Sequence, residues 1–171
     1  MEERTGIITM KGNPLTLIGK QLKIGEPVPD CEVLNNDLAP VKLSSFQGKV
    51  CVIASVPSLD TPVCDMETRR FNEEAGMLGP DVTILTISMD LPFAQKRWCG
   101  AVGVDKVITL SDHLSGSFGE TYGVLIKELR LLARAVFVLD RDGIIQYVQL
   151  VKEVADEPDY NEVLEALKNL V

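Results

Sequence analysis

An almost uninterrupted apolar run, Lys49-Val-Cys-Val-Ile-Ala-Ser-Val56, constrains the fold of this chain more than any other segment. Strands that read as continuous apolar runs, without alternating polar residues, are typical of sheets covered by helices on both faces. A second run of this kind, Thr83-Ile-Leu-Thr-Ile-Ser-Met89, follows after a segment with helical periodicity. The two runs therefore predict a β-α-β unit at the centre of an α/β fold.

Further elements are predicted on both sides of this unit. Two short β-like runs within residues 7–18 surround Lys11-Gly-Asn-Pro14, which predicts a hairpin. The other expected elements are strands at 31–34, 106–110, 134–139 and 144–150, a turn at 140–143, and helices at 65–75, 92–101 and after Pro158. This order resembles a thioredoxin-like fold, with a mixed central sheet flanked by helices and an extra N-terminal hairpin at residues 1–18. No linker or repeat divides the chain, so we expect one domain over residues 1–171.

The composition favours a soluble enzyme over a nucleic-acid-binding or membrane protein. The chain has 171 residues, of which 46% are hydrophobic and 25% charged, enough to bury a core without disulfides. Its net charge of −8 argues against nucleic acid and anionic membrane surfaces as partners. The acidic start does not resemble a signal peptide, and no apolar run approaches the roughly 18 residues of a membrane span. We expect a cytoplasmic location.

The cysteine pattern narrows the chemistry. The four cysteines form no C-x-x-C pair, so neither a thioredoxin-type dithiol nor a common zinc site is predicted, and no metal is expected. In a reducing cytoplasm, any disulfide is more often catalytic than structural. Cys51 lies within the first apolar strand, which predicts a buried structural thiol. The single histidine, His113, lies in a polar segment that predicts a solvated loop residue.

Cys64 is the strongest candidate for a reactive thiol. It ends the loop Pro57-Ser-Leu-Asp-Thr-Pro-Val-Cys64 and meets the predicted helix at its start. There the unpaired backbone N–H groups and the positive end of the helix dipole favour thiolate over thiol. Helical spacing places Cys64 on the inner stripe of the helix, and Asp65 and Glu67 are interpreted as ordinary first-turn acids. Because these acids oppose a thiolate, we expect a nearby cation to outweigh them.

Several motifs make a family resemblance specific. The spacing Pro57-x-x-x-Thr61-x-x-Cys64 resembles the peroxidatic motif of the peroxiredoxins, and the segment from Asp90 to Gly100 resembles the resolving-cysteine segment of the bacterial thiol peroxidase subfamily. Further matches are Lys11-Gly-Asn-Pro-Leu-Thr-Leu17, Ala133-Arg-Ala-Val136 and Glu157-Pro-Asp-Tyr160. The matches run from the opening hairpin to the final helix.

The resemblance implies a role for each motif residue. Cys64 attacks the peroxide O–O bond and becomes a sulfenic acid. Thr61 orients peroxide and thiolate, Arg134 stabilises the thiolate and the charge that develops on oxygen, and Pro57 shapes the pocket. Each of the four has an alternative: Cys64 as an inert buried thiol, Thr61 as a turn or cap residue, Arg134 as a surface charge at a strand edge, and Pro57 as loop punctuation.

Cys99 is the resolving cysteine that the resemblance implies, through an intrachain Cys64–Cys99 disulfide. It precedes Gly100, a predicted helix-ending residue, so we expect an accessible thiol on a segment that can loosen. A disulfide requires Cα atoms within roughly 7 Å, and two folded helices can hold them farther apart. We therefore expect local unwinding around both cysteines during turnover.

At Cys31 related proteins often have phenylalanine, which suggests a core-filling role.

The resulting prediction is an atypical two-cysteine peroxiredoxin. It reduces hydrogen peroxide or organic hydroperoxides without metal, haem or flavin; the resemblance further implies thioredoxin as reductant and a homodimer. Two alternatives remain open. The first is a one-cysteine peroxidase that uses Cys64 without Cys99. The second is a non-catalytic thioredoxin-fold module for redox signalling or protein interaction.

Overall fold

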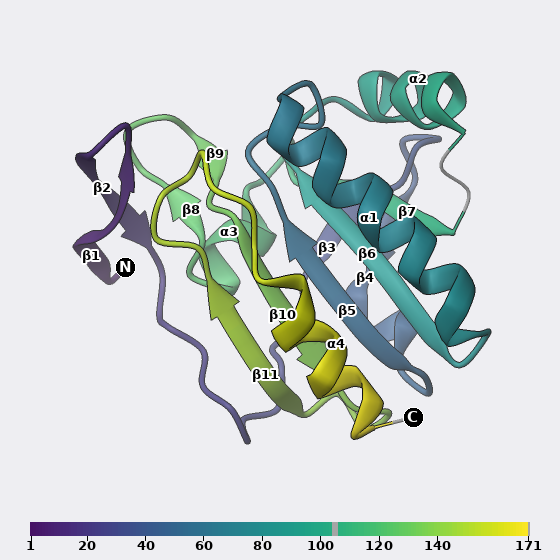
Figure 1. The fold of residues 1–171 in the computed structure, drawn as a ribbon. Helices are drawn as coiled ribbons and strands as arrows, with labels where there is room; N and C mark the ends of the chain where they lie inside the picture. Colours follow the sequence, from purple (N-terminus) through teal and green to yellow (C-terminus); the bar gives the residue numbers. More distant parts are fainter. Residues whose placement is uncertain (104–105, 171) are drawn as a thin grey trace.

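The computed structural model describes residues 1–103 and 106–170, which form strands, four α-helices and one 3-10 helix (Figure 1). The strands are β1 (Glu3–Met10), β2 (Asn13–Ile18), β3 (Glu32–Leu34), β4 (Pro40–Lys42), β5 (Val50–Ser55), β6 (Val82–Ser88), β7 (Val107–Ser111), β8 (Leu125–Ile126), β9 (Leu131–Leu132), β10 (Ala135–Leu139) and β11 (Ile145–Leu150). The helices are η1 (Leu43–Phe46), α1 (Pro62–Leu78), α2 (Pro92–Val102), α3 (Ser117–Thr121) and α4 (Tyr160–Lys168).

The central sheet is mixed, as the sequence predicted. Its strand order is β11-β10-β5-β6-β7-β3-β4. The strands β5, β6 and β7 run parallel, and β10 pairs antiparallel with β5. Every residue of β5 is buried, which confirms that the apolar run forms a strand covered on both faces.

The pleat of β5 divides its side chains between two apolar clusters. Val52 and Ala54 pack with Phe71 of α1 and Val163 of α4. Figure 1 accordingly shows α1 and α4 on the same face of the sheet. Cys51 and Ile53 point to the opposite face, where they join residues of the N-terminal hairpin and α3, including Ile8, Leu17 and Phe118.

The N-terminal hairpin belongs to a second sheet that the sequence did not predict. The strands β1 and β2 pair antiparallel around Lys11 and Gly12, which confirms the hairpin. β2 also pairs with β8, and β8 pairs with β9, which gives the strand order β1-β2-β8-β9. β8 and β9 have two residues each, too few to leave a periodic pattern in the sequence. The short elements β4, η1 and α3 were missed for the same reason.

The helix α2 ends later than the sequence suggested. It continues through Gly100 to Val102 and stops at Gly103, which adopts the left-handed conformation with φ of 71°. The Gly103 N–H donates to the carbonyl of Cys99 at 3.0 Å. The prediction that Gly100 ends the helix was therefore wrong, because Gly103 supplies the left-handed cap.

Candidate active site

Cys64 lies inside the first turn of α1. Thr61 is the N-cap residue, and Pro62 opens the helix. The Thr61 hydroxyl accepts a hydrogen bond from the Cys64 N–H at 3.2 Å and donates to the Ser58 carbonyl at 3.2 Å. In this structure Thr61 thus fills the capping role that the sequence left open beside a catalytic one.

The Cys64 side chain is closed off from solvent. Its exposed fraction is 0%, and it packs with Val56, Leu59 and the half-buried Trp98. Pro57, at the start of the same loop, is also buried. A thiol in such a position is reached only by a small molecule or after local opening of the loop.

Arg134 reaches this site because of the strand register. Ala135, the first residue of β10, pairs with Ser55, the last residue of β5, so Arg134 lies where β5 leads into the Cys64 loop. The residue is 1% exposed. Nη1 donates to Glu67 Oε1 at 3.1 Å, while Nε and Nη2 donate to the Val154 carbonyl at 3.2 and 3.1 Å. The guanidinium is therefore fixed in a buried position, and the alternative of a surface charge at a strand edge is wrong.

The charges of the site depend on this one cation. Burial lowers the pKa of Arg134, but Coulombic attraction and hydrogen bonds to Cys64 and Glu67 outweigh burial and raise the pKa above its ordinary value. Burial raises the pKa of Glu67 to about 7, although Arg134 opposes the shift. Two acidic groups thus share one guanidinium, and Arg134 is the cation expected to outweigh the helix's own acids at Cys64.

Glu67 is a site residue that the sequence analysis missed. It was interpreted as an ordinary first-turn acid, which is wrong, because its exposed fraction is 0% and it pairs with Arg134. Its Oε2 atom is buried without a hydrogen-bond partner among the described residues. The available signal was its position three residues after Cys64, which places both side chains on one face of the helix.

Cys99 lies against a neutral hydroxyl group. It is half-buried, less accessible than expected, and its Sγ lies 3.4 Å from the Thr109 hydroxyl. Thr109 in turn donates to the Asn36 side-chain oxygen at 3.1 Å. Cys64 and Cys99 are both free thiols in this structure.

Two side chains connect the Cys64 loop with the segment that carries Cys99. The Trp98 indole N–H donates to Asp65 at 2.9 Å. Asp90, which precedes α2, accepts hydrogen bonds from the Ser58 hydroxyl at 2.7 Å and the Leu59 N–H at 2.8 Å. Neither of these links was predicted from the sequence.

The remaining cysteines and the histidine lie outside this cluster. Burial raises the pKa of Cys51 to about 12, and burial together with Asp112 and Asp30 raises the pKa of Cys31 to about 12. Both are buried in the core, which confirms their expected structural role. His113 lies in a turn, which confirms its predicted loop position, but it is half-buried and its Nε2 has no hydrogen-bond partner in the described part of the chain, so the prediction that it is solvated was wrong.

Comparisons with known proteins point in one direction. A family profile described as Redoxin matches residues 23–164. Thiol peroxidases from Bacillus subtilis and Oceanobacillus iheyensis are each 57% identical to this chain, covering 96% and 94% of it and 98% and 97% of their own lengths. The crystal structure of a peroxiredoxin-like protein from Aquifex aeolicus superposes with a TM-score of 0.89 at 45% identity and covers 98% of both chains.

Proposed function

The chain belongs to the Redoxin family, within its thiol peroxidase branch, and we propose that Cys64 and Cys99 are the two cysteines of its peroxidase cycle. The enzyme is a thiol-dependent peroxidase of the peroxiredoxin type. The observation that supports Cys64 most directly is its burial beside the Arg134 guanidinium in the first turn of α1. At Cys31 and Cys51, by contrast, burial raises the pKa to about 12 and no cation among the described residues acts against it.

In the first step the Cys64 thiolate attacks one peroxide oxygen. The S–O bond forms as the O–O bond breaks, and the second oxygen leaves as water or an alcohol after taking up a proton. Arg134 stabilises both the thiolate and the negative charge that develops on the departing oxygen. Thr61 and Pro57 complete the pocket, and the Thr61 hydroxyl must exchange its bond to Ser58 for one to peroxide.

In the second step the Cys99 thiol attacks the sulfenic acid. The S–S bond forms, the S–O bond breaks, and the hydroxyl group leaves as water with the thiol proton. Cys99 Sγ contacts Thr109, whereas Cys64 packs among Val56, Leu59 and Trp98, so the segments must rearrange first. The links through Trp98 and Asp90 are those that must loosen.

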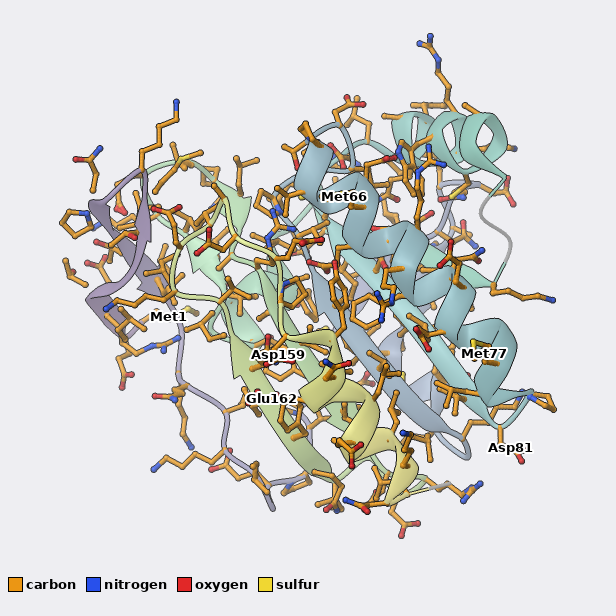
Figure 2. The ribbon with its side chains drawn as sticks, viewed as in Figure 1. Met1, Met66, Met77, Asp81, Asp159 and Glu162 are labelled. Carbon is orange, nitrogen blue, oxygen red and sulfur yellow. The ribbon has the colours of Figure 1, made fainter. Side chains whose placement is uncertain are left out.

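We further propose thioredoxin as the reductant, acting by thiol–disulfide exchange, and a homodimer in the cytoplasm. Met66, labelled near the start of α1 in Figure 2, is 50% exposed, and Leu91 and Phe93 at the start of α2 are 52% and 66% exposed. These apolar side chains beside the active site support a contact with a second copy.

Within the described residues no helix is long and apolar enough to cross a membrane. One domain is supported by the apolar cluster that hairpin residue Ile8 shares with Ile53 of the central sheet.

The decisive experiment is disulfide mapping after one equivalent of peroxide. The reduced protein is oxidised, digested without reductant and analysed by mass spectrometry. We expect a Cys64–Cys99 peptide pair within one chain. A sulfenic acid at Cys64 with no disulfide would instead favour the one-cysteine mechanism, and no peroxide consumption would remove the proposal altogether.

Variants separate the two steps. Cys64→Ser abolishes peroxide consumption, because no attacking sulfur remains. Cys99→Ser still consumes one equivalent of peroxide but loses steady-state turnover with thioredoxin. The matched control is Cys51→Ser or Cys31→Ser, which leaves the catalytic cycle unchanged.

A further inference from the structure

The hydrogen bonds around Cys99 have a defined direction. Thr109 Oγ1 lies 3.1 Å from Asn36 Oδ1, which is an acceptor only, so the threonine proton is committed to Asn36. The Thr109 oxygen is then left as an acceptor, and the Cys99 thiol, 3.4 Å away, is the donor. The order is therefore Cys99 to Thr109 to Asn36.

These two hydrogen bonds connect Cys99 to the central sheet. Thr109 belongs to β7 and is 3% exposed, and it pairs in register with Thr86 of β6. Asn36 lies in the turn between β3 and β4 at the edge of the same sheet. Cys99 thus points to the sheet, while Trp98, about 100° away around α2, contacts the Cys64 cluster.

We propose that Thr109 and Asn36 are positioning residues that hold the resolving thiol of Cys99 against the sheet until Cys64 is oxidised. This inference rests on the proposed function of Cys99. Before Cys99 attacks the sulfenic acid, its bond to Thr109 must break. The two residues do not touch peroxide or Cys64; they act through the fraction of time that Cys99 is free.

We call this restraint of Cys99 by Thr109 and Asn36 the hold. It affects the lifetime of the sulfenic acid at Cys64. A sulfenic acid that waits for Cys99 is exposed to a second peroxide, which oxidises it to the sulfinic acid. Removing the Thr109 hydroxyl releases Cys99 more often. We expect faster disulfide formation, by about threefold to tenfold for the loss of one hydrogen bond, and a smaller sulfinic acid fraction.

The test is Thr109→Val, which keeps the shape of the side chain and removes the hydroxyl. Its matched control is Thr86→Val, because Thr86 is 1% exposed, pairs with Thr109 across the strands, and has a hydroxyl without a partner among the described residues. Thr109→Ser retains a hydroxyl and is expected to restore the wild-type rate. Folding stability is measured for all three, so a general loosening is recognised.

Disulfide formation is followed by stopped flow after one equivalent of hydrogen peroxide. Trp98 is the chain's single tryptophan, beside both cysteines, and its fluorescence reports the reaction. Quenched samples analysed by mass spectrometry confirm the product. A faster rate in Thr109→Val alone, restored by Thr109→Ser, supports the hold; an equal or slower rate in Thr109→Val, or the same increase in Thr86→Val, overturns it.

Asn36→Ala provides a second test of the hydrogen bonds that run from Cys99 through Thr109 to Asn36. Because Asn36 acts only through Thr109, it should accelerate disulfide formation less than Thr109→Val does. The double variant should be no faster than Thr109→Val alone, since both changes release one thiol. Additive effects would show that Asn36 acts independently and would remove it from the hold.

Failure of the hold is distinguishable from failure of the proposed function. If mass analysis finds no Cys64–Cys99 disulfide in the wild type, Cys99 is not the resolving cysteine. If the disulfide forms but its rate of formation is the same in wild type and Thr109→Val, only the hold is wrong. Alkylation of Cys99 by iodoacetamide in the reduced protein gives a readout without peroxide: it should be faster in Thr109→Val and unchanged in Thr86→Val.

Discussion

The surroundings of Cys64 and of Cys99 differ in the kind of group that holds each sulfur. Cys64 is completely buried at a helix start, beside the Arg134 guanidinium and the Glu67 carboxyl. Cys99 is half-buried, and its neighbours Thr109 and Asn36 carry no charge. Charged contacts in a closed site are strong, whereas a thiol hydrogen bond is weak.

This difference matches two different tasks. The attacking sulfur must be ionised and fixed before peroxide arrives, which requires charges that are already in place. The resolving sulfur must travel, so a contact that breaks easily suits it. We infer that the α2 side yields first when the two sulfurs meet. The predictions below test this division, beginning with the charged side.

Arg134→Met should have the largest effect. It removes the cation that Cys64 and Glu67 share, and we expect kcat/KM for peroxide to fall by about 100-fold to 1000-fold. Peroxide consumption with excess reductant measures this. Arg141→Met, which changes an exposed arginine in the turn after β10, is the control and should retain full activity.

The double variant Arg134→Met/Glu67→Gln separates catalysis from folding. Arg134→Met alone leaves a buried carboxyl without its partner and should also destabilise the protein. The second change replaces the unpartnered carboxyl with an amide, so stability should recover while activity stays low. Activity that recovers together with stability would show that Arg134 acts only on the fold.

The elements that could be predicted are those that depend on residues adjacent in the sequence. The apolar run of β5 and the hairpin around Lys11 each follow from neighbouring residues. The motif containing Cys64 was identified for the same reason. Helix α1 begins at Pro62 rather than Asp65, because Thr61 caps it earlier than the apolar spacing suggested.

The unpredicted part depends on contacts between distant segments. The position of Arg134 beside Cys64 was expected only from the family resemblance, because it follows from the pairing of β10 with β5, which no local pattern encodes. The contact between Thr109 and Asn36 joins residues 73 positions apart. Glu67 is intermediate: its spacing from Cys64 was visible, but surface acids share it, and only the structure shows the carboxyl buried on Arg134.

Glu67→Gln sharpens the charged side of the comparison through pH. The folded-state pKa of Glu67 is raised to about 7 from an ordinary 4.5, so the folded protein binds more protons than the unfolded chain between these values. Its contribution to stability is present below pH 4.5 and is lost as pH rises to about 7. The loss is roughly 3 kcal/mol for a group buried this completely.

The measurement is the free energy of unfolding in urea at several pH values. Glu67→Gln should reduce the decline between pH 4.5 and 7, while leaving the part due to Asp112, whose pKa burial raises to about 6. Subtracting the two curves isolates Glu67. Parallel curves would mean that the Glu67 carboxyl stays ionised beside Arg134 throughout.

Trp98→Phe tests the link between the two regions and should have the smallest effect. It keeps an aromatic ring against the Cys64 cluster but removes the N–H bonded to Asp65. Because Asp65 also pairs with Arg69, we expect a loss of only about 1 kcal/mol in unfolding free energy, measured by circular dichroism in urea. The disulfide should form a few-fold faster, since α2 separates from α1 more easily.

The control for this variant is Tyr147→Phe, which removes a hydroxyl bonded at 2.8 Å to Glu162 of α4, labelled in Figure 2. It loses a hydrogen bond to a carboxylate, as Trp98→Phe does, and also the bond that the Tyr147 hydroxyl accepts from Gln149 at 2.7 Å, but away from both reactive cysteines. Its stability should fall by a similar amount, whereas the rate of disulfide formation, followed by quenching and mass analysis, should not change. If both variants accelerate the disulfide equally, the rate follows overall stability, and the division between a fixed attacking region and a yielding resolving region fails. If only Trp98→Phe does so, the barrier lies where α1 meets α2.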